Sequence, residues 1–241
     1  MFYTSLNNSK IKDLKKLKQK KYRDQTGLFL VEGEHLVEEA RKAGYLKEVL
    51  LVDDTQYEAG VSISYVSLEI MRELSSLDTP YKVMGVCKKK EEVAILGNIL
   101  ILDDVQDPGN IGTIIRSAVA FNIGTIILSP RCADIYSSKV IRASQGMIFH
   151  INIVVYDVTK IINELKGMGY KIFGTKVNFS KSLKNVSKPE KFVIIMGNEG
   201  NGVSEEVLNM CDDYIYIKMN KACESLNVAV ATSIILYEMS R

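Results

Sequence analysis

Short, almost wholly apolar segments alternate with longer segments of mixed polarity through the second half of this 241-residue chain. Such segments indicate buried strands, and their alternation with helices indicates a mostly parallel sheet covered by helices on both faces. Helices are expected near residues 110–121, 137–145, 158–167, 204–209 and 226–239. The expected strands are Ile99–Leu102, Thr125–Leu128, Ile151–Val155, Tyr170–Phe173, Phe192–Met196 and Tyr214–Ile217. The sequence therefore predicts an α/β fold, and the pattern alone favours a doubly wound, Rossmann-like order of strands.

A shorter alternation of strands and helices precedes this region. Its first helix is expected to begin at Ser9, a plausible N-cap, because Ile11, Leu14 and Leu17 recur at helical spacing. Further strands are expected near residues 27–31, 46–52, 61–66 and 83–87, and further helices near 32–42 and 68–77. The charged stretch 88–93 marks the expected boundary. Residues 1–93 are thus predicted to form a small N-terminal α/β domain, and residues 97–241 a C-terminal domain.

Positive charge is concentrated at the N-terminus. Residues 1–25 carry eight Lys and Arg against two Asp, a net charge of +6, whereas the whole chain carries only +2. Such asymmetry is typical of a basic element that meets a polyanion. The alternative is a solvated helix face with no partner.

Composition excludes several classes of protein. Hydrophobic content of 46% and charged content of 25% are ordinary for a globular protein. No apolar run approaches the roughly 20 residues that span a bilayer, and the basic N-terminus lacks the apolar stretch of a signal peptide. The four cysteines are scattered without a C-x-x-C pair and only two histidines accompany them, so we expect no metal site and a reduced, cytoplasmic setting.

Three segments of the C-terminal region place Gly, Asn, Ser or Glu just after an apolar run, where loops at strand ends present polar groups to a ligand. The first is Asp107-Pro108-Gly109-Asn110-Ile111-Gly112, followed by Arg116. Its glycines allow close backbone approach at a helix N-terminus, where free N–H groups favour an anion. Alone, this pattern is more often a plain strand–turn–helix corner with a surface arginine.

The second segment is Met196-Gly197-Asn198-Glu199-Gly200-Asn201-Gly202, in which three glycines fall within six residues after a strand. Alone it could be a turn with an exposed carboxylate.

The third segment is Glu224-Ser225-Leu226-Asn227-Val228. Ser225 is expected to cap an apolar helix that runs to residues 237–238, with Ser225 and Asn227 in its first turn. Capping alone would explain Ser225, but Asn227 is harder to dismiss because asparagine is a weak helix former.

In this order and spacing, the three segments resemble the signature motifs of the SpoU (TrmH-like) family of RNA 2′-O-ribose methyltransferases. The resemblance implies a deep trefoil knot in the parallel sheet, which no periodicity argument would propose. It also implies S-adenosylmethionine as cofactor, and catalytic roles for Asn110, Arg116, Glu199, Ser225 and Asn227. In the family the glutamate of the second motif orders the active site, so Glu199 is expected to pair with Arg116 or Asn110 and to fix their geometry. The implied cofactor-binding residues are Thr175, Gly197, Asn198, Glu199, Gly202, Ile217, Met219, Ser225 and Leu226.

The N-terminal region resembles the L30/L7Ae-like substrate-binding domain that many members of the family carry. Members with this domain usually modify ribosomal RNA, so 23S rRNA is the implied substrate, and members are homodimers. The residues expected to contact RNA are Lys10, Lys12, Lys20, Lys21, Arg23 and Lys221.

Two points qualify the resemblance. In the family the matched arginine is proposed to activate the ribose 2′-hydroxyl, but a guanidinium is a poor general base, so Arg116 could instead hold an RNA phosphate and stabilise the developing 2′-oxyanion. The family pattern has Pro at the position of Lys218 and Gly at that of Lys221, so the local backbone and the cofactor site could be altered. These lysines could also add phosphate contacts.

Other functions remain as alternatives. A Rossmann dehydrogenase is disfavoured because G-x-G-x-x-G is absent after the first strand of the C-terminal region. A tRNA 2′-O-methyltransferase, or a non-catalytic RNA-binding protein with a degenerate cofactor site, stays open.

Overall fold

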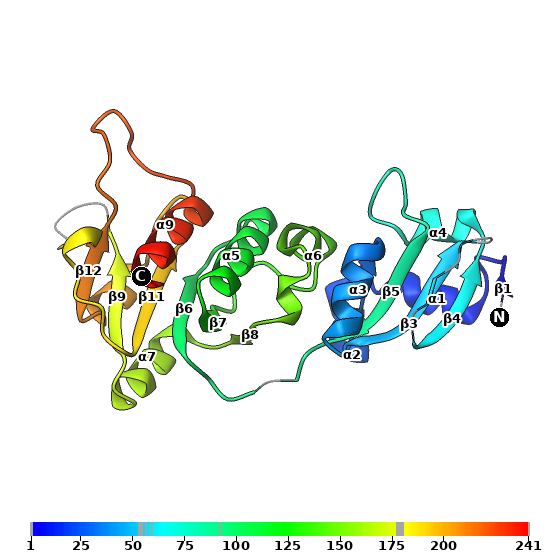
Figure 1. Cartoon of the computed structure of the whole chain (residues 1–241), viewed down its shortest axis with the longest axis horizontal. Coiled ribbons are helices and arrows are strands. Elements are labelled where there is room, and N and C mark those ends of the chain that lie inside the picture. Colours follow the sequence, from blue (N-terminus) through cyan, green and yellow to red (C-terminus); the bar gives the residue numbers. More distant parts are fainter. Residues whose placement is uncertain are drawn as a thin grey trace. The chain divides into compact units, whose positions relative to one another are not determined.

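The computed structural model describes residues 2–52, 55, 57–58, 60–91, 93–176 and 181–240. The chain divides into two compact units (Figure 1). The N-terminal unit comprises Met1–Glu91 with Asp134–His150, and the C-terminal unit comprises Glu92–Ala133 with Ile151–Arg241.

A parallel sheet forms the centre of the C-terminal unit. Within the described residues it has seven strands, and every pairing between neighbours is parallel. The strands are β6 (Asn98–Asp103), β7 (Ile123–Leu128), β8 (Asn152–Val155), β9 (Lys171–Thr175), β10 (Lys181–Ser182), β11 (Phe192–Gly197) and β12 (Asp213–Tyr216). All six strands expected from the sequence are present, and the two-residue β10 is an addition that carries too little pattern to be predicted.

The strand order differs from the Rossmann-like order that the pattern favoured. The order is β10-β12-β9-β11-β6-β7-β8, so β11 lies between β6 and β9. A doubly wound sheet would instead place β9, the next strand in the chain after β8, beside β6. Because Gly197 of β11 pairs with Asp103 of β6, the polar segments that follow these two strands start side by side. The trefoil knot stays a prediction of the resemblance.

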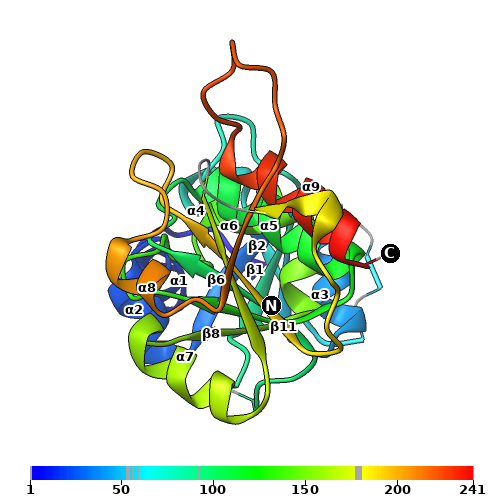
Figure 2. The same cartoon turned by 90° about the vertical axis from the view of Figure 1, so that its left-hand side faces the viewer.

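Helices cover both faces of this sheet, as expected. They are α5 (Pro108–Ala120), α7 (Val158–Gly167), α8 (Glu205–Asn209) and α9 (Val228–Ser240), with a short 3₁₀ turn at Leu183–Asn185. Ile99 and Ile101 of β6 join α7 and α8 in one apolar cluster. The helices α5 and α9 pack against each other on the opposite face (Figures 1 and 2). The core therefore lies on both sides of β6 and β11, which fixes the ends of these strands.

The N-terminal unit is built on a mixed sheet in the order β1-β4-β3-β5-β2, in which β5 runs antiparallel to β3 and β2. Its strands are β1 (Phe2–Tyr3), β2 (Leu28–Glu32), β3 (Leu46–Val52), β4 (Ser62–Val66) and β5 (Val83–Lys88). Its helices are α1 (Ser9–Lys16), α2 (Lys20–Thr26), α3 (Glu34–Lys42), α4 (Leu68–Leu74) and α6 (Ser138–Ser144), followed by a 3₁₀ turn at Met147–Phe149. The apolar stripe of α1 packs with α4 on one face of the sheet. The cap of α1 is Asn8, which accepts from the Lys10 N–H, so the expected Ser9 cap is off by one residue.

The segment 134–150 packs with residues 1–91, although the expected domain boundary placed it in the C-terminal domain. The ring of Phe29 lies 4.8 Å from that of Tyr136 and 6.1 Å from that of Phe149, measured between centroids. His150 lies 2.8 Å from the carboxylate of Glu39. These contacts link distant parts of the chain, which local patterns cannot reveal. No helix in the described part of the chain is long and apolar enough to cross a membrane.

Candidate active site

A pocket of about 610 Å³ opens at the carboxyl ends of β9, β11 and β12. Its walls come from the ends of these neighbouring parallel strands and from the start of α9, which is where ligands bind in open α/β sheets. All nine residues expected to bind the cofactor line it: Thr175, Gly197, Asn198, Glu199, Gly202, Ile217, Met219, Ser225 and Leu226.

Further lining residues were not expected from the sequence. Most are apolar: Met196, Val203, Leu208, Ile215, Val228, Ala231 and Ile235. Polar lining residues include Lys176, Glu205 and Tyr216. Several of them could have been predicted from their positions, because they lie next to the motif residues on the same strands and the same helix.

Hydrogen bonds join the three motifs in one chain of side chains. The Asn110 amide donates to the Glu199 carboxylate through Nδ2, with 3.0 Å between the atoms. Asn227 donates through its own Nδ2 to Oδ1 of Asn110, at 2.9 Å. Because Asn110 accepts on one side and donates on the other, the orientation of its amide is fixed. Of the two partners expected for Glu199, the structure has Asn110 and not Arg116.

The Glu199 carboxylate also binds backbone N–H groups of the first motif loop. It accepts from the N–H groups of Gln106, at 3.2 Å, and Asp107, at 3.0 Å. Burial by itself raises the pKa of Glu199, but the hydrogen bonds from Asn110 and from the backbone of Asp107, Glu199 and Gln106 outweigh it and hold the pKa below its usual value. Glu199 is therefore an anion at neutral pH and acts by ordering the loop rather than by donating a proton.

The second motif closes into a tight loop. Asn198 and Gly202 exchange backbone hydrogen bonds of 3.0 and 2.9 Å, and the Asn198 side chain donates to the Asp104 carbonyl at 2.9 Å. A Cβ on Gly197 would lie 2.0 Å from the backbone of Gly202 and Val203, so this position excludes any side chain. The glycines thus let the loop fold over the end of β11, beside the pocket.

Comparisons with known proteins agree with this geometry. The family model described as the SpoU rRNA Methylase family matches residues 97–237, which is more than half of the chain. This chain belongs to the SpoU rRNA methylase family. The model of the MRM3-like substrate binding domain matches residues 8–85, which confirms a substrate-binding domain in the N-terminal region.

Several known proteins are similar to this chain over nearly its whole length. A Bacillus subtilis protein, the 23S rRNA (guanosine(2553)-2′-O)-methyltransferase RlmP, is 39% identical, and the match covers 98% of this chain and 97% of that one. A structure of an AdoMet-bound rRNA methyltransferase from Sinorhizobium meliloti has a TM-score of 0.90 at 29% identity, covering 99% and 97% of the two chains. A putative RNA methyltransferase of the TrmH family from Porphyromonas gingivalis has a TM-score of 0.87 at 29% identity, covering 98% of each chain.

The third SpoU motif begins its helix later than expected. The helix α9 starts at Val228, and the Asn227 side chain caps it by accepting from the N–H groups of Ala229 and Val230. The expected Ser225 cap is therefore wrong. Asparagine is as good an N-cap as serine, and its amide has a second end that can donate to Asn110 at the same time. Ser225 is exposed in the preceding loop and lines the pocket.

Arg116 lies exposed on α5 and is not among the residues that line the pocket. Within the described residues it makes no hydrogen bond or ion pair. Its neighbour Ser117 contacts Ser233 of α9, with 2.7 Å between the hydroxyl oxygens. The guanidinium is thus carried by a helix that contacts α9, six residues beyond Asn110, and is free to bind an anion from outside the chain.

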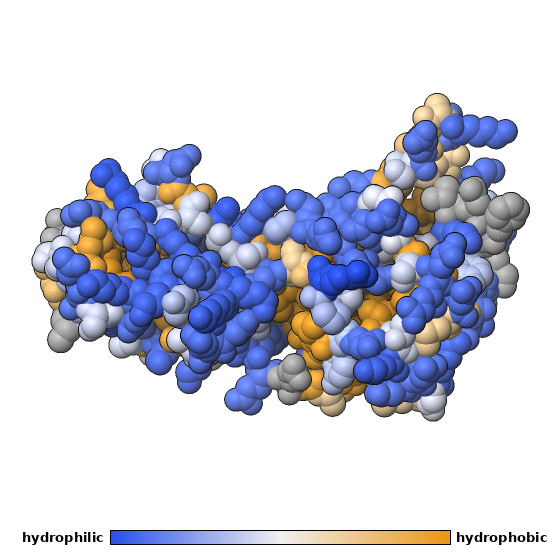
Figure 3. All heavy atoms as spheres, turned by 180° about the vertical axis from the view of Figure 1, so that it is seen from behind, coloured by the Kyte–Doolittle hydropathy of each residue, from blue (hydrophilic) through white to orange (hydrophobic). Residues whose placement is uncertain are grey.

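The segment 217–227 contains the two departures from the SpoU pattern, Lys218 and Lys221. It forms no helix or strand and stands away from the sheet (Figures 1 and 2, orange). Figure 3 shows hydrophilic and hydrophobic side chains mixed along it. Both lysines are exposed, and Met219 between them is half-buried and lines the pocket.

The residues expected to contact RNA differ in their exposure and in whether they form ion pairs. Lys12 and Lys21 are exposed, whereas Lys20 pairs with Asp24 at 2.7 Å and Lys10 pairs with Glu48. Arg23 corrects the expectation most clearly. Its side chain is only 7% exposed, pairs with Asp134 and donates to the Leu17 carbonyl at 2.7 Å. It lies on the buried side of α2, and the run of charged residues in the sequence does not show which side that is.

Proposed function

We propose that this chain transfers a methyl group from S-adenosylmethionine to a ribose 2′-hydroxyl of RNA, with 23S rRNA as the substrate. The observation that carries the proposal is the hydrogen-bonded chain Glu199–Asn110–Asn227, which unites the three SpoU motifs beside one pocket. The 23S rRNA methyltransferase activity named for the Bacillus subtilis relative supports the substrate.

The pocket fits the cofactor in size and chemistry. Its volume of about 610 Å³ lies within the range of about 300–1,000 Å³ that is usual for small-molecule sites. Met219, Leu226 and Ile215 offer an apolar surface for an adenine ring, and the loop 197–202 offers backbone groups for polar atoms. When bound, S-adenosylmethionine supplies a methyl group made electrophilic by its sulfonium.

The protein's own residues position and activate the hydroxyl. Glu199, Asn110 and Asn227 hold the ends of β6, β11 and the start of α9 in one geometry, which removes the entropic cost of assembling the site. Arg116 binds an RNA phosphate and stabilises charge that develops on the 2′-oxygen. We assign Arg116 this electrostatic role, because a guanidinium is a poor general base and the exposed side chain makes no ion pair or hydrogen bond within the described chain.

Calorimetric titration with S-adenosylmethionine, followed by ribose-methylation mapping of rRNA incubated with the protein, tests the proposal. We expect saturable binding and one newly methylated ribose in 23S rRNA. Methylation of tRNA instead would correct the substrate, and folded protein that binds RNA but neither binds nor uses S-adenosylmethionine would indicate a non-catalytic RNA binder.

A second copy of the chain is the partner that α9 fits best. Val230, Ile234 and Tyr237 recur at helical spacing on its surface and are 48%, 38% and 51% exposed. Apolar stripes of this kind on a folded domain mark interaction surfaces. We propose a homodimer through α9, so sedimentation is expected to show a dimer that Ile234→Glu converts to monomer. A wild-type monomer at the concentrations of the activity assay would contradict this.

The N-terminal unit supplies RNA affinity through the exposed lysines of α1 and α2, because phosphate contacts give sequence-independent binding. The four free cysteines are consistent with a reducing setting, and we place the protein in the cytoplasm.

A further inference from the structure

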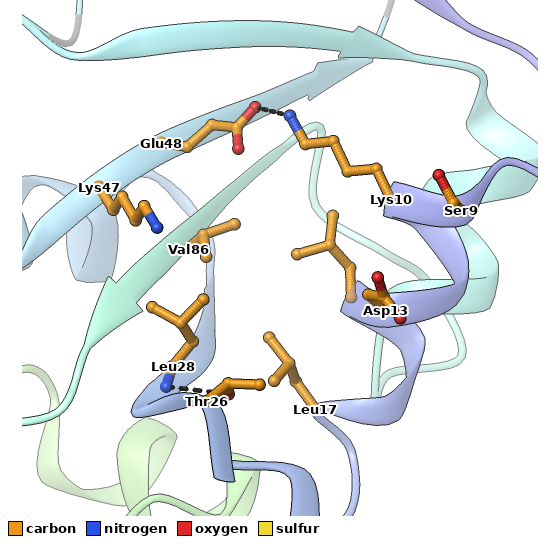
Figure 4. Close-up of a pocket in the computed structure, with 10 residues that line it drawn as sticks. Ser9, Lys10, Asp13, Leu17, Thr26, Leu28, Lys47, Glu48 and Val86 are labelled. Carbon is orange, nitrogen blue, oxygen red and sulfur yellow. Dashed lines mark hydrogen bonds and ion pairs between the residues drawn. The ribbon is translucent and has the colours of Figure 1, made fainter.

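A second pocket lies in the N-terminal unit, between α1 and the sheet (Figure 4). Its volume is about 360 Å³. Leu14, Leu17 and Val86 form a buried apolar floor, and Leu28 adds a half-buried wall. Polar side chains surround this floor: Ser9, Lys10, Asp13, Thr26, Lys47 and Glu48. An apolar base ringed by a few polar groups is the usual design of a small-ligand site.

A β-bulge places two charged side chains of β3 at the same pocket. Leu46 pairs with Cys87 and Glu48 pairs with Val86, so Lys47 is an extra residue on β3. Successive side chains of a regular strand point to opposite faces, and a bulge re-aims one of them. Figure 4 shows Lys47 and Glu48 both reaching toward the hollow. The bulge therefore places a lysine beside a carboxylate, above the apolar floor of the pocket.

Some of the charged side chains at this pocket are paired with an opposite charge, and others are not. Glu48 pairs with Lys10 and accepts from Ser64, and both contacts use Oε1. Within the described chain Oε2 has no hydrogen-bond partner, although the Glu48 side chain is only 14% exposed. Asp13 pairs with Lys16 at 2.8 Å. Lys47 is exposed and has no ion pair among the described residues.

The unmatched groups are thus an acceptor within the pocket and a cation at its rim. A nucleotide offers the complement of both. An aromatic base covers an apolar floor, an exocyclic amino group donates to a carboxylate oxygen, and a phosphate meets a lysine. A paired base cannot enter, because its edge and faces are already covered in the duplex.

We propose that this pocket binds one unpaired nucleotide with an amino-bearing base, with the base on Leu14, Leu17 and Val86, its amino group on Glu48 and its phosphate on Lys47. The nucleotide belongs to the RNA substrate, and this assignment of its source rests on the proposed function. A free nucleotide has the same chemistry, so the experiment separates the two sources.

Fluorescence anisotropy of the full chain with labelled RNA tests the proposal. The probes are a hairpin with an adenosine loop, the same hairpin with a uridine loop, and a blunt duplex of the same stem. Uridine lacks the amino group, so we expect wild type to prefer the adenosine loop by about five- to tenfold. Glu48→Ala should bring this ratio close to one, and the ratio cancels any general gain from removing a negative charge.

Lys47→Ala and Lys12→Ala form a matched pair, since both lysines are exposed and Lys12 lies outside the pocket. Lys47→Ala should weaken hairpin binding about fivefold, reduce its salt slope by about one, and change duplex binding less. Lys12→Ala should weaken hairpin and duplex alike. Saturable binding of AMP, lost in Lys47→Ala, would identify free nucleotide as the source, whereas loop preference without AMP binding identifies RNA.

Equal binding of the two loops by wild type, or equal effects of the two lysine variants on every probe, would overturn the proposal. Retained loop preference in Glu48→Ala would overturn it as well. Cofactor binding and rRNA methylation are measured on the same preparations. Their loss with an intact loop preference would refute the methyltransferase proposal alone, and the reverse result would refute the pocket alone.

Discussion

Arg116→Ala is expected to reduce methyl transfer to RNA by at least about a hundredfold, because removing one electrostatic stabiliser of a transition state typically costs that much. The affinity for S-adenosylmethionine should stay within about twofold. Arg116 is exposed on α5 and does not line the cofactor pocket, so its loss leaves the pocket intact. Single-turnover methylation of rRNA measures the first effect, and calorimetry measures the second.

Arg116→Lys is the matched variant for this experiment. It keeps the charge but loses the planar fork that binds phosphate through two N–H groups, so we expect partial activity. Full activity in Arg116→Lys would show that charge alone is sufficient. A collapse of cofactor affinity in Arg116→Ala would refute the assigned role, because it would place the guanidinium in the cofactor site.

Most of the secondary structure could be predicted from local sequence patterns, because the apolar residues of an element and the residues at its ends indicate the same structure. The helix expected at 158–167 and the strand expected at 46–52 have those bounds in the structure. The helix has apolar residues at helical spacing, the strand is marked by the apolar run Val49–Val52, and Gly or Asp residues limit both. The elements missed were α2 and the short strands β1 and β10. The α2 sequence is almost wholly polar, so no apolar stripe marks it, and its single buried residue is Arg23.

Strand order could not be predicted in the same way. The placement of β11 between β6 and β9 depends on packing between segments about 90 residues apart, which leaves no periodic trace in the sequence. The resemblance to a family supplied what the pattern could not. It placed Asn110, Glu199 and Asn227 in one catalytic group with Arg116 and Ser225, and the structure shows hydrogen bonds that join the first three.

Partners of individual side chains were the least predictable feature of the site. The sequence offered Arg116 and Asn110 equally as partners of Glu199, and only the folded geometry separates them. The N-cap of α9 shows the same limit. Ser225 and Asn227 both have capping side chains, and the helix starts where the second can also reach Asn110.

Glu199→Gln is expected to reduce methyl transfer by about ten- to a hundredfold and to lower cofactor affinity as well, unlike Arg116→Ala. Glutamine has nearly the same shape, but one of its two terminal atoms is an NH₂ group and cannot accept. It must therefore lose either the bonds from Asp107 and Asn110 to Oε1 or the bond from Gln106 to Oε2. The loop 104–107, which leads into α5 and so positions Asn110, would then lose its fixed position beside the pocket.

The pH dependence of stability distinguishes this account from a simple packing defect. Hydrogen bonds hold the pKa of Glu199 below its usual value of 4.5, so its carboxylate stabilises the folded state above that pH. That contribution is lost as the pH falls through the folded-state pKa. Glutamine does not titrate, so the difference in unfolding free energy between wild type and Glu199→Gln should be about 1 kcal/mol near pH 7 and should shrink below about pH 4.5.

Urea unfolding of the two proteins at neutral and acidic pH measures this difference. Asn110→Ala is the matched control, because it removes the same hydrogen bond to Glu199 without removing the titrating group. Its destabilisation should change with pH less than that of Glu199→Gln, since the backbone donors of Gln106 and Asp107 remain on the carboxylate. A difference between wild type and Glu199→Gln that is constant from acidic to neutral pH would mean that the negative charge of Glu199 does not order the loop. The loss of activity in that variant would then have to come from direct contact of Glu199 with the substrate or cofactor.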